Sequence, residues 1–322
     1  MTDTPKLLIT RPLPDKVLEK ASEHFEAVMR PSTTPLSDEE LTGALMDFDA
    51  VLPTLGDLFS ADVFDAVGGH CRAQILANFG VGYNHIDVHA ARAVRVEVTN
   101  TPGAVTDATA DIALTLMLMA SRRAGEGERL VRSGDWEGWH PTQMLGQHVT
   151  GKTLGVVGMG RIGKAIAKRA HHGFDMDVVF FNRSTVEDAG VPARQLETLE
   201  GVAKTADFVV VSVPGGADTH HLIDAKMFSA MKATGVFVNI SRGDVVDEKA
   251  LVSALKKGKI ASAGLDVYEN EPEVPQALMG MENVVLLPHL GTAALEVREQ
   301  MGLMAVDNLI AFFEGKAPPN AV

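Results

Sequence analysis

The chain has 322 residues, of which 46% are hydrophobic and 22% are charged, and its formal net charge is −13. This balance is typical of a soluble globular protein with two domains, and the negative charge disfavours nucleic acid or an anionic membrane as a partner. The single cysteine, Cys71, excludes an internal disulfide. The first residues show no secretory signal, and the most apolar predicted helix, residues 112–120, is too short to span a bilayer, so we expect a cytoplasmic protein.

Strands and helices alternate through residues 6–98. Short apolar runs predict buried strands at residues 7–9, 50–52, 75–77 and 94–98. Amphipathic stretches predict helices at residues 15–24, 37–46 and 60–67, and the second of these begins with a capping box formed by Ser37 and Glu40. Such alternation predicts a parallel sheet with helices on both faces, and the turn at residues 100–103 marks the expected hinge after this block.

A polar segment follows the next predicted helix, which covers residues 107–122. It contains both tryptophans of the chain, Trp136 and Trp139. Because exposed tryptophans are costly in a monomer, we expect this segment to pack on a domain or on a partner subunit. The alternative is an ordinary loop whose aromatic side chains fold onto their own domain.

The sequence from residue 153 to residue 184 predicts a strand, a glycine turn, a helix and a second strand. The turn reads G-M-G-R-I-G over residues 158–163. In this setting Gly158 permits a tight turn, Gly160 lets the backbone approach a pyrophosphate, and Gly163 lets the helix pack closely on the strand. The N–H groups at the start of the helix favour phosphate. The unit therefore predicts a dinucleotide-binding site.

The end of the second strand departs from the pattern of NAD sites. An acidic residue usually follows the glycines by about 20 residues and holds the adenosine ribose hydroxyls. This chain instead has Asn182, Arg183 and Ser184 at that place. The planar guanidinium matches a 2′-phosphate, so the sequence favours NADP(H) over NAD(H) without excluding NAD(H). The alternative is a solvated surface arginine.

Further apolar runs predict strands at residues 208–213, 236–240, 261–265 and 284–287. With the first two they make six, the number that a full dinucleotide-binding sheet needs. Helices are predicted at residues 225–231 and 248–257, and one amphipathic helix over residues 294–315 closes the chain. This last helix follows the sixth strand and is expected to fold back onto the first block. We therefore expect one discontinuous domain, residues 1–101 plus 291–322, and a second domain, residues 102–290.

Polar side chains follow three of these strands where each strand ends. Arg242, Asp266 and His289 hold these positions. Ligands bind at the carboxyl ends of parallel strands, so their joint placement indicates one crevice. Taken singly, Arg242 could form a surface ion pair, Asp266 or Glu271 could cap a helix, and His289 could be a structural core residue.

No metal site is expected. The adjacent pairs His171-His172 and His220-His221 have no acid or cysteine partner at matching spacing along the sequence. Both pairs are therefore expected to be solvated.

Five stretches, in this order along the chain, carry a resemblance to a known family. They are NFGVGYNHID at 78–87, GMGRIG at 158–163, NISRGDVVD at 239–247, GLDVYENEP at 264–272 and LPHLG at 287–291. Across essentially its whole length the chain resembles the D-isomer-specific 2-hydroxyacid dehydrogenases. It is most similar to the glyoxylate/hydroxypyruvate reductase branch, whose members also carry a Trp-x-x-Trp segment and often lack the acid after the second strand.

The resemblance implies an α/β protein with two doubly wound parallel-sheet domains, one a discontinuous, flavodoxin-like substrate-binding domain and the other a Rossmann cofactor domain. It implies a homodimer that reduces a short 2-oxo acid, such as glyoxylate or hydroxypyruvate, to the D-2-hydroxy acid with hydride from NAD(P)H. One alternative is an enzyme like phosphoglycerate dehydrogenase. The other is a dinucleotide-sensing binding protein like the corepressors that share this fold.

The resemblance also implies roles for single residues. Arg242 would pair with the substrate carboxylate, His289 would transfer the proton, and Glu271 would hydrogen-bond the imidazole. Substrate binding is implied for Leu55, Val81, Gly82, Arg242, His289 and, from a neighbouring subunit, Trp139. Cofactor binding is implied for Thr106, Gly158, Gly160, Arg161, Ile162, Gly163, Asn182, Arg183, Ser184, Ser212, Val213, Pro214, Thr219, Ile240, Ser241, Arg242, Asp266, His289 and Gly291.

Overall fold

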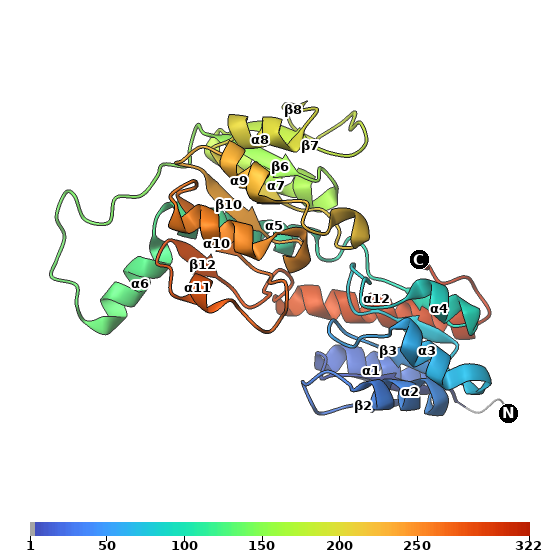
Figure 1. Cartoon of the computed structure of the whole chain (residues 1–322). Helices are drawn as coiled ribbons and strands as arrows, with labels where there is room; N and C mark the ends of the chain where they lie inside the picture. Colours follow the sequence, from blue (N-terminus) through green and yellow to red (C-terminus); the bar gives the residue numbers. More distant parts are fainter. Residues whose placement is uncertain (1–3) are drawn as a thin grey trace. The chain divides into compact units, whose positions relative to one another are not determined.

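A computed structural model describes residues 4–322, which form two compact units (Figure 1). The first unit comprises the residues up to Val105 together with Thr292–Val322, and the second comprises Thr106–Gly291. The chain therefore passes to the second unit after residue 105, where residue 101 was expected, and returns after residue 291, one residue later than expected. The first passage lies directly before Thr106, where a long helix begins.

The first unit contains a five-stranded parallel sheet in the order β2-β1-β3-β4-β5. This is the strand order of flavodoxin-like sheets. The strands are β1 (Lys6–Ile9), β2 (Glu26–Met29), β3 (Ala50–Leu52), β4 (Ile75–Ala77) and β5 (Glu97–Thr99). The helices are α1 (Asp15–His24), α2 (Asp38–Asp47), α3 (Ala61–Val67), the short 3₁₀ helix η1 (Gly68–His70), α4 (Val88–Ala93) and α12 (Leu295–Phe313).

Two elements of this sheet differ from the prediction. Strand β2 has no counterpart in the prediction, because it is an edge strand whose residues are half-buried or exposed and so form no apolar run. The strand predicted at residues 94–98 begins too early, since Val94 ends α4 and β5 begins only at Glu97.

The last helix, α12, belongs to the first unit. It packs against α1 so closely that a Cβ on Gly302 would overlap the side chain of Val17. Ala305 and Leu309 on the same helix are fully buried in the core of this unit. The capping box at α2 is present, because Ser37 Oγ accepts from the N–H of Glu40 and the Glu40 carboxylate accepts from the N–H of Ser37.

The second unit contains a seven-stranded parallel sheet in the order β12-β11-β10-β9-β6-β7-β8. The strands are β6 (Thr153–Val157), β7 (Asp177–Phe181), β8 (Ala193–Gln195), β9 (Phe208–Val211), β10 (Val236–Asn239), β11 (Ser262–Leu265) and β12 (Val284–Leu286). The helices are α5 (Thr106–Ser121), α6 (Ala124–Ser133), α7 (Arg161–Phe174), α8 (Leu199–Thr205), η2 (Ala217–Thr219), α9 (Ala225–Ala230), η3 (Gly243–Val245), α10 (Glu248–Lys256) and α11 (Gln276–Met279).

Counted within this unit, the strand order is 3-2-1-4-5-6, as in dinucleotide-binding sheets, with a seventh strand added at one edge. Six strands were expected. The seventh strand by this count is β12, which was expected; the strand that was not expected is β8. It is a three-residue edge strand with no buried residue, so it leaves no apolar signal in the sequence. The strand order reverses between β6 and β9, and ligands bind in the crevice at such a reversal.

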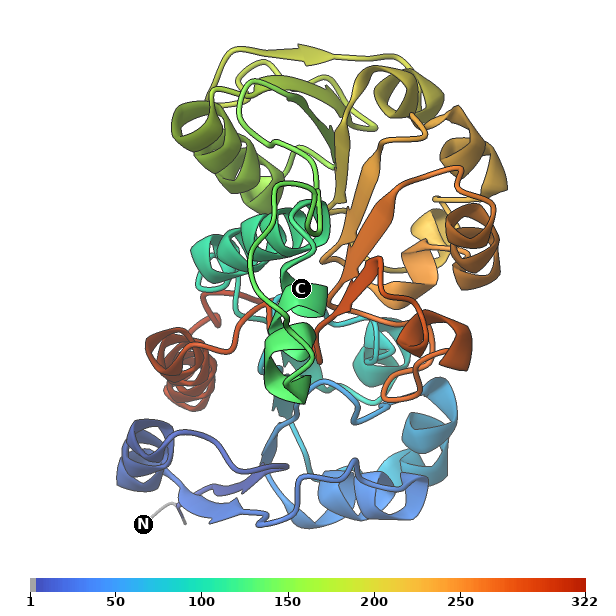
Figure 2. The same ribbon diagram turned by 90° about the vertical axis from the view of Figure 1, so that its left-hand side faces the viewer.

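Helices cover both faces of this sheet. In Figure 2, α5 and α7 lie on one side of the strands, and α9 and α10 lie on the other. Helix α5 approaches β11 so closely that a Cβ on Gly264 would lie 2.8 Å from Cβ of Leu116. In Figure 1, α6 and the loop that follows it extend away from the sheet; we call α6 and residues 134–148 the arm. No helix within residues 4–322 is long and apolar enough to cross a membrane.

Candidate active site

The glycine turn after β6 leaves room for a phosphate group. Gly158 has φ +97°, and a Cβ there would lie 2.8 Å from the Val213 side chain. A Cβ on Gly163 would overlap the carbonyl oxygen of Gly158. At Gly160, by contrast, the Cβ position has no heavy atom within 4 Å and lies beside the first turn of α7. This open space at a helix N-terminus fits the pyrophosphate of a dinucleotide.

The loop after β9 is joined to the glycine turn. Ser212 Oγ donates a hydrogen bond of 2.7 Å to the carbonyl oxygen of Gly158. Thr219 Oγ1, in η2, donates one of 2.7 Å to the carbonyl of Pro214. Ser212 and Val213 therefore lie next to the glycine turn, at the point where the strand order reverses, and Thr219 is tied to the same loop through Pro214.

The turn after β7 has a fixed backbone. Asn182 Oδ1 accepts from the N–H of Met159, and Asn182 Nδ2 donates to the carbonyl of Ser184. Gln195 Nε2, on β8, donates to the carbonyls of Asn182 and Ser184. The Arg183 side chain projects from this turn and is 88% exposed. Gln195 was not foreseen, because the strand that carries it was not foreseen.

An imidazole and a carboxylate meet at the carboxyl ends of β11 and β12. His289 Nδ1 lies 2.8 Å from Glu271 Oε2, and the other carboxylate oxygen, Oε1, accepts a 3.1 Å hydrogen bond from the N–H of Tyr268. Burial opposes ionisation of this carboxyl. The contacts with His289 and Tyr268 and the charge of Arg242 outweigh it, so the pKa of Glu271 lies below its ordinary value. Glu271 is therefore a carboxylate at neutral pH.

Arg242 follows β10, the neighbouring strand in the sheet. Its guanidinium NH1 donates to the carbonyl of Ser241, and its own carbonyl accepts from Asn239 Nδ2. Burial lowers the pKa of Arg242, and the charges of Glu271 and Asp244 act against that lowering. An arginine starts from so high a pKa that it remains a cation at neutral pH. A cation, an imidazole and a carboxylate thus lie at three successive strand ends.

Asp266 fixes the turn that carries His289. Its two carboxylate oxygens accept from the N–H groups of Leu290, at 2.6 Å, and Gly291, at 2.8 Å. The N–H of His289 donates to the Asp266 carbonyl, and His289 has a left-handed backbone with φ 54°. Burial raises the pKa of Asp266. The hydrogen bonds from the N–H groups of Leu290 and Gly291 and the charge of His289 lower it, but by less. The carboxylate is thus already engaged by the backbone, a role that was not foreseen when it was assigned to the cofactor.

Several supporting residues were also not foreseen. Tyr268 Oη donates to the carbonyl of Leu287, which ties the loop after β11 to the loop after β12. Glu248 Oε1 accepts from the N–H of Glu269. A Cβ on Gly243 would overlap the backbone of Tyr268, so only glycine allows η3 to lie against this loop. These contacts join residues far apart in sequence, and no spacing pattern reveals them.

The expectation that His221 lacks an acid partner is wrong, while its side chain is 38% exposed. His221 Nε2 lies 2.8 Å from Glu269 Oε1, and the ring of His220 stacks on that of His221 with centroids 4.0 Å apart. The acid lies 48 residues further along the chain, and it is the parallel sheet that brings the two loops together. His171 Nδ1 also has a partner, the carbonyl of Met176. No group of three metal-binding side chains occurs among the described residues.

Three predicted substrate-binding residues, Leu55, Val81 and Gly82, belong to the first unit. Asn78 Nδ2 donates to the carbonyl of Gly82, and Asn100 Nδ2 donates to that of Val81, so the backbone of this loop is fixed by two amides.

The Asn78 amide and the Leu55 carbonyl are themselves hydrogen-bonded by neighbouring side chains. His85 Nε2 lies 3.0 Å from Asn78 Oδ1 and so orients that amide. The carbonyl of Leu55 accepts a hydrogen bond from Arg11 NH1. Sequence reasoning missed these supporting side chains.

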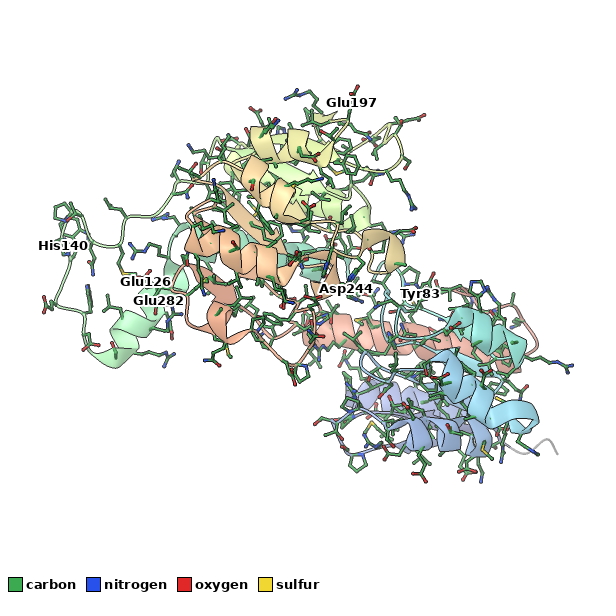
Figure 3. The ribbon with its side chains drawn as sticks, viewed as in Figure 1. Tyr83, Glu126, His140, Glu197, Asp244 and Glu282 are labelled. Atoms are coloured by element: carbon green, nitrogen blue, oxygen red, sulfur yellow. The ribbon has the colours of Figure 1, made fainter. Side chains whose placement is uncertain are left out.

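The two tryptophans lie in the arm. Trp139 is 80% exposed and Trp136 is 50% exposed. His140, next to Trp139, is labelled in Figure 3 far from the sheet of its unit. Trp139 is therefore not folded onto its own unit, which excludes the ordinary-loop alternative for this residue.

A dinucleotide-binding sheet with arginine, carboxylate and histidine at adjacent strand ends defines an NAD(P)-dependent dehydrogenase. The model of the family described as D-isomer specific 2-hydroxyacid dehydrogenase, NAD binding domain, matches residues 114–291. The glyoxylate reductase of Thermococcus kodakarensis is 44% identical to this chain, over 99% of this chain and 96% of its own length.

Solved structures agree. The NADPH-dependent glyoxylate/hydroxypyruvate reductase of Sinorhizobium meliloti, in complex with NADP and malonate, has a TM-score of 0.87 and 37% identity, covering 99% of this chain and 97% of that one. The D-mandelate dehydrogenase of Rhodotorula graminis has a TM-score of 0.85 and 31% identity, with coverages of 99% and 97%. The chain belongs to the D-isomer-specific 2-hydroxyacid dehydrogenase family, and the expected fold class of two parallel-sheet domains is confirmed.

Proposed function

We propose that this protein reduces glyoxylate, hydroxypyruvate and similar short 2-oxo acids to the D-2-hydroxy acids, with NADPH preferred over NADH. The observation that carries the proposal is the 2.8 Å contact between His289 and Glu271, on strand ends beside that of Arg242. The relatives named glyoxylate reductase support this substrate class over the phosphoglycerate-dehydrogenase and corepressor alternatives.

Arg242, His289 and Glu271 have different roles in this proposal. The Arg242 guanidinium pairs with the substrate carboxylate and directs the 2-oxo group toward His289. A bound nicotinamide cofactor supplies the hydride that the carbonyl carbon accepts. As the carbonyl oxygen gains negative charge, His289 delivers a proton to it from Nε2, because Nδ1 is committed to Glu271. The ionised Glu271 stabilises the protonated imidazole before the transfer.

The second unit provides the cofactor site in this proposal. Gly158, Gly160 and Gly163 would cradle the pyrophosphate at the start of α7, and Arg183 would hold the 2′-phosphate. Residues at the ends of the next strands, from Ser212 to Gly291, would line the nicotinamide half. The open space at Gly160 supports this assignment.

Three residues of the first unit are also proposed to bind the substrate. The backbone N–H groups of Val81 and Gly82 would bind the substrate carboxylate, and Leu55 would border the pocket. The carbonyls of Val81 and Gly82 are held by Asn100 and Asn78, which orients the peptide units that carry the donors.

A homodimer in the cytoplasm completes the proposal. Four large apolar side chains of the arm are exposed: Val131 by 60%, Trp136 by 50%, Trp139 by 80% and Leu145 by 68%. Exposed apolar side chains of this size, four within one short segment, favour a partner surface. An ion pair of Arg129 with Glu282 joins α6 to the residues just before β12, and Glu282 is labelled in Figure 3. Trp139 would then reach the substrate pocket of the other subunit.

A matrix of kcat/KM values tests the proposal. Glyoxylate, hydroxypyruvate, pyruvate and 3-phosphohydroxypyruvate are each assayed with NADPH and with NADH. We expect the largest values for glyoxylate and hydroxypyruvate with NADPH. A largest value for the phosphorylated acid would instead favour a phosphoglycerate dehydrogenase. Binding of dinucleotide without turnover of any of these acids would overturn the assignment as a reductase.

A further inference from the structure

The arginine proposed to bind the 2′-phosphate faces an acidic side chain. Arg183 NH1 lies 3.4 Å from Asp218 Oδ2, and the two side chains are 88% and 86% exposed. Asp218 belongs to η2, in the loop between β9 and α9, 35 residues from Arg183 in sequence. The pair therefore spans two loops of the same unit, those after β7 and after β9.

Both backbones that carry the pair are fixed. On one side, Gln195 donates to the carbonyls that flank Arg183. On the other, Thr219 Oγ1 donates to the carbonyls of Pro214 and Gly216, and the N–H of His221 donates to the carbonyl of Asp244. The two charged groups therefore approach each other from two anchored loops.

We infer that Asp218 competes with the 2′-phosphate for Arg183 and thereby limits the preference for NADPH. This inference rests on the proposed cofactor assignment. A phosphate that pairs with the guanidinium must displace the carboxylate from it, and the loss of that ion pair costs free energy. NADH carries no 2′-phosphate, so it leaves the ion pair intact. Asp218 is thus a specificity-determining residue that keeps NADH usable.

The variant Asp218→Asn tests this inference. We expect kcat/KM with NADPH to rise about fivefold at low ionic strength, the effect of one exposed charge pair, while kcat/KM with NADH changes less than about twofold. The gain should shrink as salt is added, because exposed charges are screened. By calorimetry, 2′,5′-ADP should bind Asp218→Asn more tightly than it binds the wild type by the same factor, and 5′-AMP should bind both equally.

Two further variants test whether the effect is specific to Asp218 and whether it acts through Arg183. Glu197→Gln removes an exposed acid elsewhere on the same unit (Figure 3) and should leave the binding of 2′,5′-ADP unchanged. In an Arg183→Gln background, Asp218→Asn should have no effect, since the carboxylate acts through the arginine.

The outcomes keep the two hypotheses distinguishable. An unchanged affinity for 2′,5′-ADP in Asp218→Asn, or an equal gain in the Arg183→Gln background, would overturn the inference. If Arg183→Gln alone leaves 2′,5′-ADP binding unchanged, the assignment of the 2′-phosphate to Arg183 fails as well, whether or not the protein reduces glyoxylate.

Discussion

His289 Nδ1 lies 2.8 Å from Glu271 Oε2, and this contact determines which nitrogen of the ring can act on a substrate. Because Nδ1 donates to the carboxylate, the proton that the ring gives up in the proposed reaction must sit on Nε2. Asp266 fixes the same loop through the N–H groups of Leu290 and Gly291. The orientation of the imidazole is therefore set by two acids. Glu271 forms a hydrogen bond with the ring, and Asp266 accepts hydrogen bonds from the backbone that follows it.

Replacing His289 with alanine should abolish most of the reduction. A positioned general acid contributes roughly 10²–10⁴-fold, so we expect kcat for glyoxylate to fall by about three orders of magnitude. The dissociation constant of NADPH, measured by fluorescence titration, should change little, because the glycine turn and Arg183 are untouched. Normal turnover of glyoxylate by this variant would show that the proton comes from another group.

The variant Glu271→Gln should separate charge from hydrogen bonding at this imidazole. Glutamine keeps the size of the side chain but cannot stabilise a protonated ring, so we expect kcat/KM for reduction to fall roughly 10- to 100-fold. The dissociation constant of NADPH should change little, because the glycine turn is untouched. A kcat/KM equal to that of the wild type would contradict a role for the carboxylate charge.

The contribution of the Glu271 carboxylate to the free energy of unfolding should depend on pH in the acid range. The pKa of Glu271 is lowered in the folded protein, so its stabilising effect is complete above the ordinary value of 4.5 and is lost as the pH falls below that value. The difference in free energy of unfolding between wild type and Glu271→Gln should therefore shrink as the pH falls below 4.5. Urea unfolding at several pH values measures it, and a difference that grows toward acid pH would contradict the lowered pKa.

Two glycines of the turn after β6 should respond differently to alanine. Gly160→Ala places its methyl in open space, so the free energy of unfolding should be unchanged while the dissociation constant of NADPH rises at least about tenfold, because the backbone can no longer approach the pyrophosphate. Gly163→Ala drives a methyl into the carbonyl of Gly158 and should cost about 2 kcal/mol of stability. Thermal unfolding and NADPH titration of both variants check this contrast, and equal stability losses would refute it.

Apolar runs in the sequence predict the strands that are buried on both faces. The buried strands β1, β3 and β4 form continuous apolar runs because helices cover both faces of their sheet. The runs predicted β3 and β4 at their observed bounds, and β1 one residue too short at its start. The half-exposed edge strands β2 and β8 carry no such run and were missed. The six strands expected in the second unit therefore included β12, the seventh strand, in place of β8.

Long-range side-chain contacts leave no periodic signal at all. Arg242, Asp266 and His289 could be proposed as site residues because each lies within two residues of the end of an apolar run. The pairing of His221 with Glu269, and that of Arg183 with Asp218, join loops after different strands through exposed or half-exposed groups. Only the strand order of the folded sheet brings such groups together, so no spacing along the chain could have indicated them.

Trp139 gives the sharpest test of the proposed dimer. Its side chain is 80% exposed on the arm, and we propose that it completes the substrate pocket of the other subunit. Trp139→Ala should therefore lower kcat/KM for hydroxypyruvate while size-exclusion chromatography still shows a dimer, and His289→Ala should be inactive.

A hybrid dimer of these two variants, isolated with two different affinity tags, then distinguishes the two possible geometries. If Trp139 acts across the interface, the subunit that keeps His289 receives an intact Trp139 from its partner. One of the two sites is then complete, and the hybrid should show about half of the wild-type turnover per dimer, as expected for a symmetric pair. If Trp139 acts within its own chain, neither site is complete, and the hybrid should be no more active than Trp139→Ala alone.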